Sequence, residues 1–142
     1  VRELLELIEL EPADYIDRFP GELSGGQKQR IGIARALAAE PKFIICDEVT
    51  SALDQLVAEG ILRLLSNLQQ ELDLAYMFIT HDIATVKAIA DDVVVMQYGK
   101  VVEKDAKAEL FSPPHEDYTQ LLLSSVPEMD PDWLSRVLAN RT

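Results

Sequence analysis

The chain has 142 residues, which is about the length of one domain. Its 13 Lys and Arg residues against 25 Asp and Glu residues give a net charge of −12, which disfavours a nucleic-acid binder because such proteins neutralise phosphates with basic side chains. With 48% apolar and 27% charged residues the chain can bury a core. A single cysteine, Cys46, excludes an internal disulfide and indicates a reducing cytosol. No apolar stretch approaches the roughly 20 residues that span a bilayer.

The negative charge is unevenly distributed along the chain. The stretch from Gly21 to Asp54 holds four basic and five acidic residues, so it is nearly neutral, whereas the flanks carry most of the excess acid. An anionic ligand would therefore meet the least repulsion in this stretch.

Two helices are predicted before the first strand. The spacing of apolar residues predicts a short amphipathic helix over Val1 to Leu10. Because the chain opens inside this pattern and has no initiator methionine, we expect it to be a fragment. Ser24, with Gln27 three residues later, has the pattern of a capping box and predicts a second helix that runs to Glu40, before a proline.

Two short apolar runs, Phe43 to Cys46 and Ala75 to Ile79, predict strands. Fully apolar runs of this length suit parallel strands that are covered on both faces. Between them, steps of three and four residues predict a long amphipathic helix with its apolar face formed by Val57, Ile61, Leu64, Leu65, Leu68 and Leu72. A shorter helix with apolar residues at 83, 86 and 89 follows the second strand.

The end of the chain has a different pattern. Val93 to Gln97 and Val101 to Lys104 flank a turn at Gly99, which predicts a β-hairpin at an antiparallel edge. Beyond Ala106 the helical pieces are short and are interrupted by prolines at 113, 114, 127 and 131. We predict an α/β fold, a mostly parallel sheet with flanking helices, over residues 1–104 and a helical, proline-rich extension over residues 105–142.

Polar residues follow both strands of the predicted sheet. In open α/β sheets ligands bind beyond the carboxyl ends of the strands. At the first strand end, Asp47 is suited to hold Mg²⁺, and Glu48 is suited to orient and polarise an attacking water. At the second, His81 is suited to contact a terminal phosphate or that water. The alternative for Asp47 and Glu48 is that they only mark the place where a strand ends in a polar loop. The alternative for His81 is that it is a hydrogen-bonded loop histidine.

Ser24, Gly25 and Gly26 lie at the start of the second predicted helix. A helix N-terminus attracts anions, and glycine lets the backbone approach a phosphate closely. The alternative is an ordinary capped helix behind a turn. Lys28 and Arg30 are equally consistent with a solvated helix face.

In order and spacing, these motifs resemble those of ATP-binding-cassette (ABC) ATPases. Leu23 to Arg30 resembles the signature motif, Phe43 to Glu48 the Walker B strand, Ser51 to Asp54 the D-loop, and His81 the switch histidine. The resemblance covers the chain to about Glu103 and implies the second half of a P-loop NTPase-like nucleotide-binding domain.

The tail carries a second resemblance. Phe111 to His115, with Tyr118 and Thr119, is similar to the C-terminal extension of the oligopeptide and dipeptide importer ATPases. This similarity implies the ATP-hydrolysing subunit of a peptide importer, with ATP and Mg²⁺ as cofactors. The implied partners are a second ABC ATPase subunit, in a homo- or heterodimer, and transmembrane permease subunits, but no nucleic acid. The implied location is cytoplasmic, at the inner face of the membrane.

The resemblance also implies a role for each motif. In that family two cassettes enclose ATP between them, and the signature of one closes over the nucleotide of the other. Catalysis on the cassette's own nucleotide would use Glu48 as base, His81 beside the phosphate and Asp47 on Mg²⁺. The residues implied to face the partner's ATP are Ser24, Gly25, Gly26, Gln27 and Asp54.

Two departures from the family pattern are visible. Val49 stands where the family usually has proline, which removes no catalytic group. The six glycines also offer no P-loop spacing of glycine, four residues, glycine, lysine and Ser or Thr. We therefore expect this chain alone neither to bind ATP tightly nor to hydrolyse it.

Two other functions remain open at this point. The chain could be a non-catalytic interaction module that supplies its signature motif to a partner cassette. It could also belong to a soluble ABC ATPase of DNA repair or translation, which the proline-rich tail disfavours.

Overall fold

The computed structural model describes residues 1–125. The predictions that concern residues 126–142, including the prolines at 127 and 131, lie outside the described residues. The chain divides into two compact units, Val1–Ile79 and a second that begins at Thr80, and each is described by itself.

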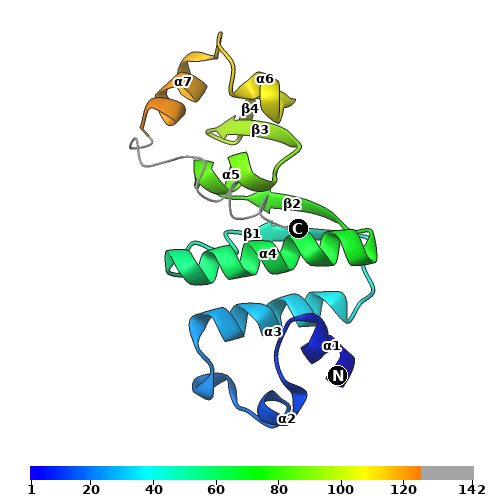
Figure 1. Ribbon diagram of the computed structural model, residues 1–142. Coiled ribbons are helices and arrows are strands. Elements are labelled where there is room, and N and C mark those ends of the chain that lie inside the picture. Colours follow the sequence, from blue (N-terminus) through cyan, green and yellow to red (C-terminus); the bar gives the residue numbers. More distant parts are fainter. Residues whose placement is uncertain (126–142) are drawn as a thin grey trace. The chain divides into compact units, whose positions relative to one another are not determined.

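The first unit contains five helices and two strands (Figure 1). In chain order they are α1 (Arg2–Leu7), α2 (Pro12–Tyr15), the 3₁₀ helix η1 (Pro20–Glu22), α3 (Gly25–Leu37), β1 (Phe43–Asp47), α4 (Gln55–Leu72) and β2 (Ala75–Ile79). The predicted alternation of helix and strand is confirmed.

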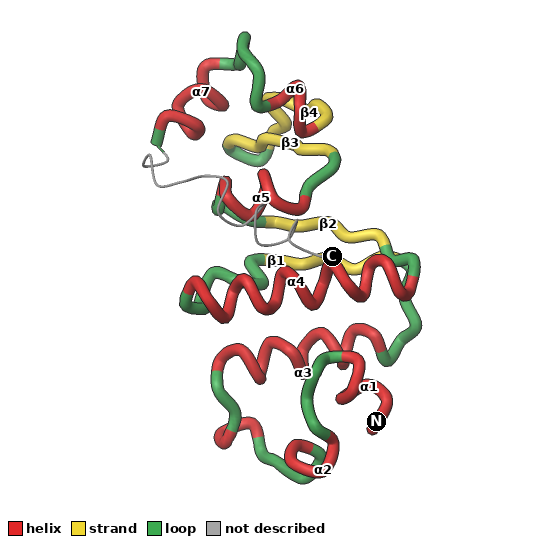
Figure 2. The backbone as a smooth tube through the Cα atoms, viewed as in Figure 1, coloured by secondary structure: helices red, strands yellow, loops and turns green. Residues whose placement is uncertain are grey.

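The strands β1 and β2 pair in parallel, as predicted (Figure 2). Phe43 lies opposite Ala75 and Asp47 opposite Ile79, so the two strands end together. The backbone N–H of Glu48 donates a hydrogen bond of 2.8 Å to the carbonyl of Ile79, which extends the pairing past the end of β1. This pairing fixes the edge at which Asp47 and Glu48 lie.

Helix α4 forms the centre of the first unit, between α3 and the strand pair (Figures 1 and 2). Ile61, Leu64, Leu65 and Leu68 on its apolar face are at most 2% exposed. They belong to one core cluster with residues of α3 and β1, including Leu37 and Cys46. The predicted amphipathic helix over the sheet is therefore confirmed, except that Leu72, the last residue of its predicted apolar face, is 42% exposed.

Two local expectations were wrong. Strand β1 is covered on one face only: Cys46 is buried, but Phe43 and Ile45 are 53% and 56% exposed, because the helices of this unit pack against the other face. The helix predicted to run to Glu40 ends at Leu37. Glu40 adopts a left-handed φ of 47°, which a continuing helix does not allow.

The second unit carries the predicted hairpin. Its elements are α5 (Ile83–Ile89), β3 (Asp92–Gln97), β4 (Lys100–Ala106), α6 (Lys107–Leu110) and α7 (Asp117–Ser124). Tyr98 and Gly99 both have positive φ, as a two-residue hairpin turn between twisted strands requires.

The hairpin was expected to form an antiparallel edge. Among the described residues, β3 and β4 pair with each other as an antiparallel two-stranded sheet. The division of the chain at residue 104 stays a prediction. Over residues 1–125, no helix combines the length and the apolar character needed to cross a membrane.

Truncation of a core leucine should destabilise the first unit strongly. Leu65→Ala removes a side chain that is 1% exposed, so the free energy of unfolding should fall by about 2–5 kcal/mol. Leu56→Ala, on the same helix at an 80% exposed position, is the matched control and should change it by about 0.5 kcal/mol or less. Urea denaturation measures both, and equal effects of the two substitutions would contradict this account of the core.

Candidate functional site

The start of α3 carries the capping box predicted from the sequence. The hydroxyl of Ser24 accepts a hydrogen bond of 3.3 Å from the backbone N–H of Gln27, and the Gln27 side-chain oxygen accepts one of 2.9 Å from the Ser24 N–H. The Gln27 amide also donates to the hydroxyl of Tyr15 at 2.8 Å. Ser24 and Gly25 are exposed. A fixed helix N-terminus thus faces solvent, where its dipole favours an anion.

The start of α4 is fixed in a similar way. One carboxylate oxygen of Asp54 accepts a hydrogen bond of 3.0 Å from the backbone N–H of Val57. Asp54 ends the loop that begins at Ser51. At the start of that loop, the hydroxyl and the backbone N–H of Ser51 donate hydrogen bonds of 3.0 and 3.1 Å to the Glu48 carbonyl. The loop from Ser51 to Asp54 is therefore bound both to the end of β1 and to the first turn of α4.

Asp47 and Glu48 are both exposed at the end of β1. Glu48 has a φ of 47°, a left-handed conformation that is uncommon for a residue other than glycine. Its N–H is bound to the Ile79 carbonyl and its carbonyl accepts from Ser51, so the surrounding hydrogen bonds hold this conformation. The backbone around both carboxylates is thus well fixed.

The starts of α3 and α4 pack against each other through two glycines. A Cβ placed on Gly25 would lie 3.4 Å from Leu53 Cδ2, and a Cβ on Gly26 would lie only 2.5 Å from Val57 Cγ1. The second distance is too short for any side chain. Gly26 is therefore needed for packing, a reason that the sequence motif did not reveal. Its role in letting a phosphate approach the backbone stays a prediction.

His81 lies in the second unit, in an exposed loop before α5. The loop is fixed by its neighbours: the N–H of Asp82 donates to the Thr80 hydroxyl at 3.0 Å, and the Asp82 carboxylate accepts from the N–H groups of Ala84 and Thr85 at 3.0 and 3.2 Å. The cooperation of His81 with Glu48 stays a prediction.

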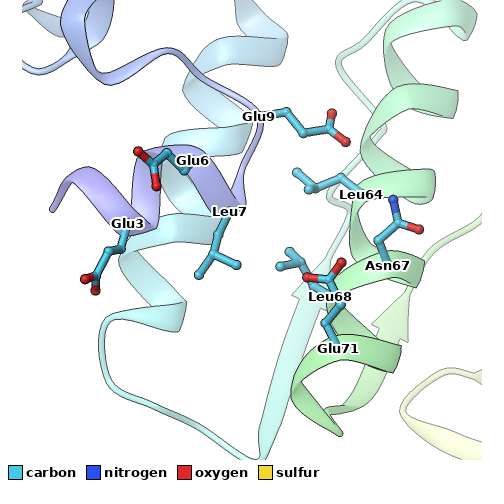
Figure 3. A pocket seen from close by; sticks show the side chains of 8 residues that line it. All are labelled: Glu3, Glu6, Leu7, Glu9, Leu64, Asn67, Leu68 and Glu71. Atoms are coloured by element: carbon cyan, nitrogen blue, oxygen red, sulfur yellow. The ribbon is translucent and has the colours of Figure 1, made fainter.

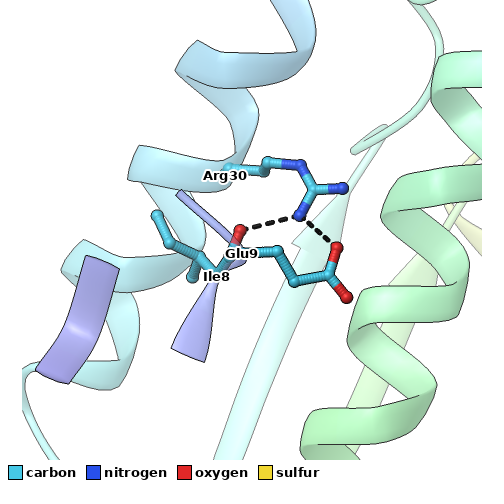
Figure 4. Close-up of polar contacts among 3 residues, drawn as sticks. All are labelled: Ile8, Glu9 and Arg30. Atoms are coloured by element: carbon cyan, nitrogen blue, oxygen red, sulfur yellow. Dashed lines mark hydrogen bonds and ion pairs between the residues drawn. The ribbon is translucent and has the colours of Figure 1, made fainter. Parts of the chain in front are cut away.

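Arg30 is an anchor between α3 and the end of α1, not part of a solvated face. Its Nη1 donates hydrogen bonds of 2.7 Å to the carbonyl of Ile8 and to a carboxylate oxygen of Glu9 (Figure 4). Glu9 has a left-handed φ of 58°, so the arginine holds a sharp turn after α1. These partners lie far from Arg30 in the sequence, and no local pattern signals the contact.

A hollow of about 540 Å³ lies between α1 and α4 (Figure 3), and none of the residues predicted to act on ATP lines it. Its lining combines apolar and acidic side chains: Leu7, Leu64, Leu68, Asn67, Glu3, Glu6, Glu9 and Glu71. Among the described residues, only Glu9 of its four glutamates is paired with an arginine, so the carboxylates of this hollow repel a triphosphate. This hollow is therefore a poor site for the phosphates of a nucleotide.

The carboxylates fit a partial magnesium site. Within residues 1–125, no three or more His, Cys, Asp or Glu residues gather closely enough to hold a metal by themselves. Mg²⁺ is commonly bound through one or two carboxylates, substrate phosphates and retained waters. The exposed carboxylate of Asp47, at a strand end, suits that mode of binding.

Family models match both ends of the chain. The model described as ABC transporter matches residues 1–51, and the model described as oligopeptide/dipeptide transporter, C-terminal region, matches residues 102–141.

Curated relatives match nearly the whole chain. The oligopeptide transport ATP-binding protein OppF of Streptococcus mutans is 52% identical over 92% of this chain and 42% of its own length. OppF of Bacillus subtilis is 49% identical over 94% of the chain and 43% of its length. OppD of Mycobacterium tuberculosis is 49% identical over 92% of the chain and 21% of its length. The chain thus spans less than half the length of these relatives.

Solved structures support the fold. CbiO1 from Clostridium perfringens, part of an ABC transporter complex, is 37% identical with a TM-score of 0.69, over 77% of this chain and 43% of its own. A putative metal-chelate type ABC transporter in an inward-facing conformation is 34% identical with a TM-score of 0.71, over 78% and 43%.

Cys46, directly before the two carboxylates, should be unreactive. It is 5% exposed, and burial raises the pKa of its thiol from 9.0 to about 11, so its thiolate fraction at pH 8 falls about 100-fold. Labelling by a thiol reagent, followed by absorbance, should therefore be far slower in the native chain than in urea. In the native chain the rate should rise with pH until about pH 11, and equal rates in both states would contradict the burial of Cys46.

Proposed function

The chain belongs to the ABC transporter family, and we propose that it is the signature and Walker B part of the ATP-hydrolysing subunit of a peptide importer. One observation carries this proposal most directly. Within a single unit, two capped helix N-termini pack against each other, and the loop between β1 and α4 joins them to Asp47 and Glu48.

Glu48 is the proposed general base for hydrolysis. Its carboxylate accepts a proton from water while the water oxygen bonds to the γ-phosphorus of ATP, and the bond from that phosphorus to the ADP oxygen breaks. Asp47 would hold Mg²⁺, which when bound neutralises charge on the phosphate oxygens. His81 would contact the γ-phosphate or the water. The hydrogen bonds that fix the backbone of Glu48 support a positioned base.

The start of α3 is proposed to serve a nucleotide held by a second cassette. Ser24, Gly25, Gly26 and Gln27 would meet its γ-phosphate with a helix N-terminus, and Asp54 would lie beside them. The exposure of Ser24, Gly25 and Asp54 supports this role, because a group that serves a partner's ligand must lie at the surface. The partner is proposed to be a second ABC ATPase subunit.

Peptide transport and the membrane setting are proposed from the tail and the relatives. The match of residues 102–141 to the oligopeptide/dipeptide transporter model favours an importer over a soluble ATPase of DNA repair or translation. Permease subunits in the membrane would be the remaining partners, and they would place the subunit at the cytoplasmic face. The relatives named for oligopeptide transport support this choice of substrate class.

The sequence also supports a second role for the chain taken alone. Its 142 residues contain no P-loop pattern, whereas the start of α3 is well formed. By itself the chain would therefore supply a signature surface to an intact cassette. It would neither bind ATP tightly nor hydrolyse it.

Replacement of the proposed base tests the catalytic role. In the longer protein that contains this chain, Glu48→Gln should leave nucleotide affinity intact but lower kcat by about 100-fold or more, because the amide cannot accept the proton. Glu71→Gln makes the same change at an exposed position at the end of α4 and should leave kcat unchanged. Phosphate release measures turnover, and substantial hydrolysis by Glu48→Gln would remove Glu48 from this role.

The chain alone should not bind nucleotide tightly. Titration calorimetry of the 142-residue chain with Mg·ATP should show no binding in the micromolar range, because no P-loop backbone is available to hold the β- and γ-phosphates. The longer protein, titrated under the same conditions, is the positive control. A micromolar dissociation constant for the chain alone would refute the proposal that it does not bind ATP tightly by itself.

A further inference from the structure

Val57 makes two contacts that join the start of α4 to the start of α3. Its backbone N–H donates a hydrogen bond of 3.0 Å to the Asp54 carboxylate. Its side chain occupies the space beside Gly26, where a Cβ would lie 2.5 Å from Val57 Cγ1 and 3.9 Å from Val57 Cβ. One residue thus contacts both the loop that ends at Asp54 and the glycine turn of α3.

This contact is stiff for three reasons. Valine is branched at Cβ and has few rotamers, so its methyl group cannot swing away as the end of a long side chain would. The turn around Gly26 is held by the hydrogen bonds between Ser24 and Gln27. The loop before Val57 is held by Ser51 and Asp54. A displacement on one side of the contact is therefore passed to the other side.

We propose that Val57 is a positioning residue that couples the glycine turn of α3 to the loop from Ser51 to Asp54, so that the two move together. The functional part of this inference rests on the proposed function, in which both segments act at the nucleotide of a second cassette. Gly26 then has two roles, because its missing Cβ leaves room for Val57 as well as for a phosphate.

A double-mutant cycle tests the coupling in the longer protein. Gly26→Ala should force the α3 turn and the Ser51–Asp54 loop apart, and amide hydrogen exchange over residues 50–57 should become about tenfold faster. Val57→Ala removes the two methyl groups of the valine. In the double variant, exchange over residues 50–57 should return to within about twofold of the parent protein.

Turnover should follow the same cycle. We expect Gly26→Ala to lower kcat about tenfold or more with a smaller change in KM. In the double variant with Val57→Ala, kcat should be at least about threefold higher than in Gly26→Ala alone. Val57→Thr keeps the branched shape and should retain more kcat than Val57→Ala. Gly32→Ala is the matched control on α3, because nothing lies within 4 Å of a Cβ at that position, and both readouts should match the parent.

The outcomes separate this inference from the proposed function. If Val57→Ala fails to rescue hydrogen exchange in the Gly26→Ala variant, the coupling is refuted. If exchange is rescued but kcat stays as low as in Gly26→Ala alone, Gly26 acts only through close approach to phosphate and Val57 has no positioning role. If the parent protein does not hydrolyse ATP, the proposed function fails, whereas the exchange measurements still decide the coupling.

Discussion

The burial of one helix, α4, holds the first unit together. Its apolar face packs with residues of α3 and of the strand pair in a single core. Each fully buried leucine contributes about 1.5–3 kcal/mol, whereas a typical hydrogen bond contributes about 1 kcal/mol. Because α4 begins directly after the loop that leaves β1, burial of Ile61, Leu64 and Leu65 also sets where Asp54 and Val57 lie. Apolar packing therefore determines the geometry of the polar site.

Much of the fold could be predicted because its signals are local. The Ser24 and Gln27 pair announces the start of α3, and the actual hydrogen bonds are those of a capping box. The apolar run before Asp47 predicts β1, and the apolar residues that recur at steps of three and four predict α4. The carboxylates at the strand end were also placed correctly at the edge of the sheet, because two parallel strands of equal length end together.

The contacts that could not be predicted join residues far apart in the sequence. Arg30 reaches the turn after α1, and Val57 fills the space beside Gly26. Neither pair has a spacing that a helix or strand period would reveal. The exposed face of β1 was missed for a related reason: an apolar run predicts a strand that suits burial, but which packed elements cover each face depends on the rest of the fold. Phe43 and Ile45 show this difference.

The parallel pairing of β1 and β2 has a consequence for the order of folding. Two parallel strands cannot be joined by a tight turn, so β1 and β2 meet only after the chain between them has closed a long loop. The hydrogen bonds of helix α4 join residues that are close in the sequence, so the helix can form before the strands pair. Once formed, it reduces the length of flexible chain between β1 and β2 and presents an apolar face. The rate-limiting step of folding for this unit is then expected to be the docking of a preformed α4, with residues near Leu65 partly packed in the transition state.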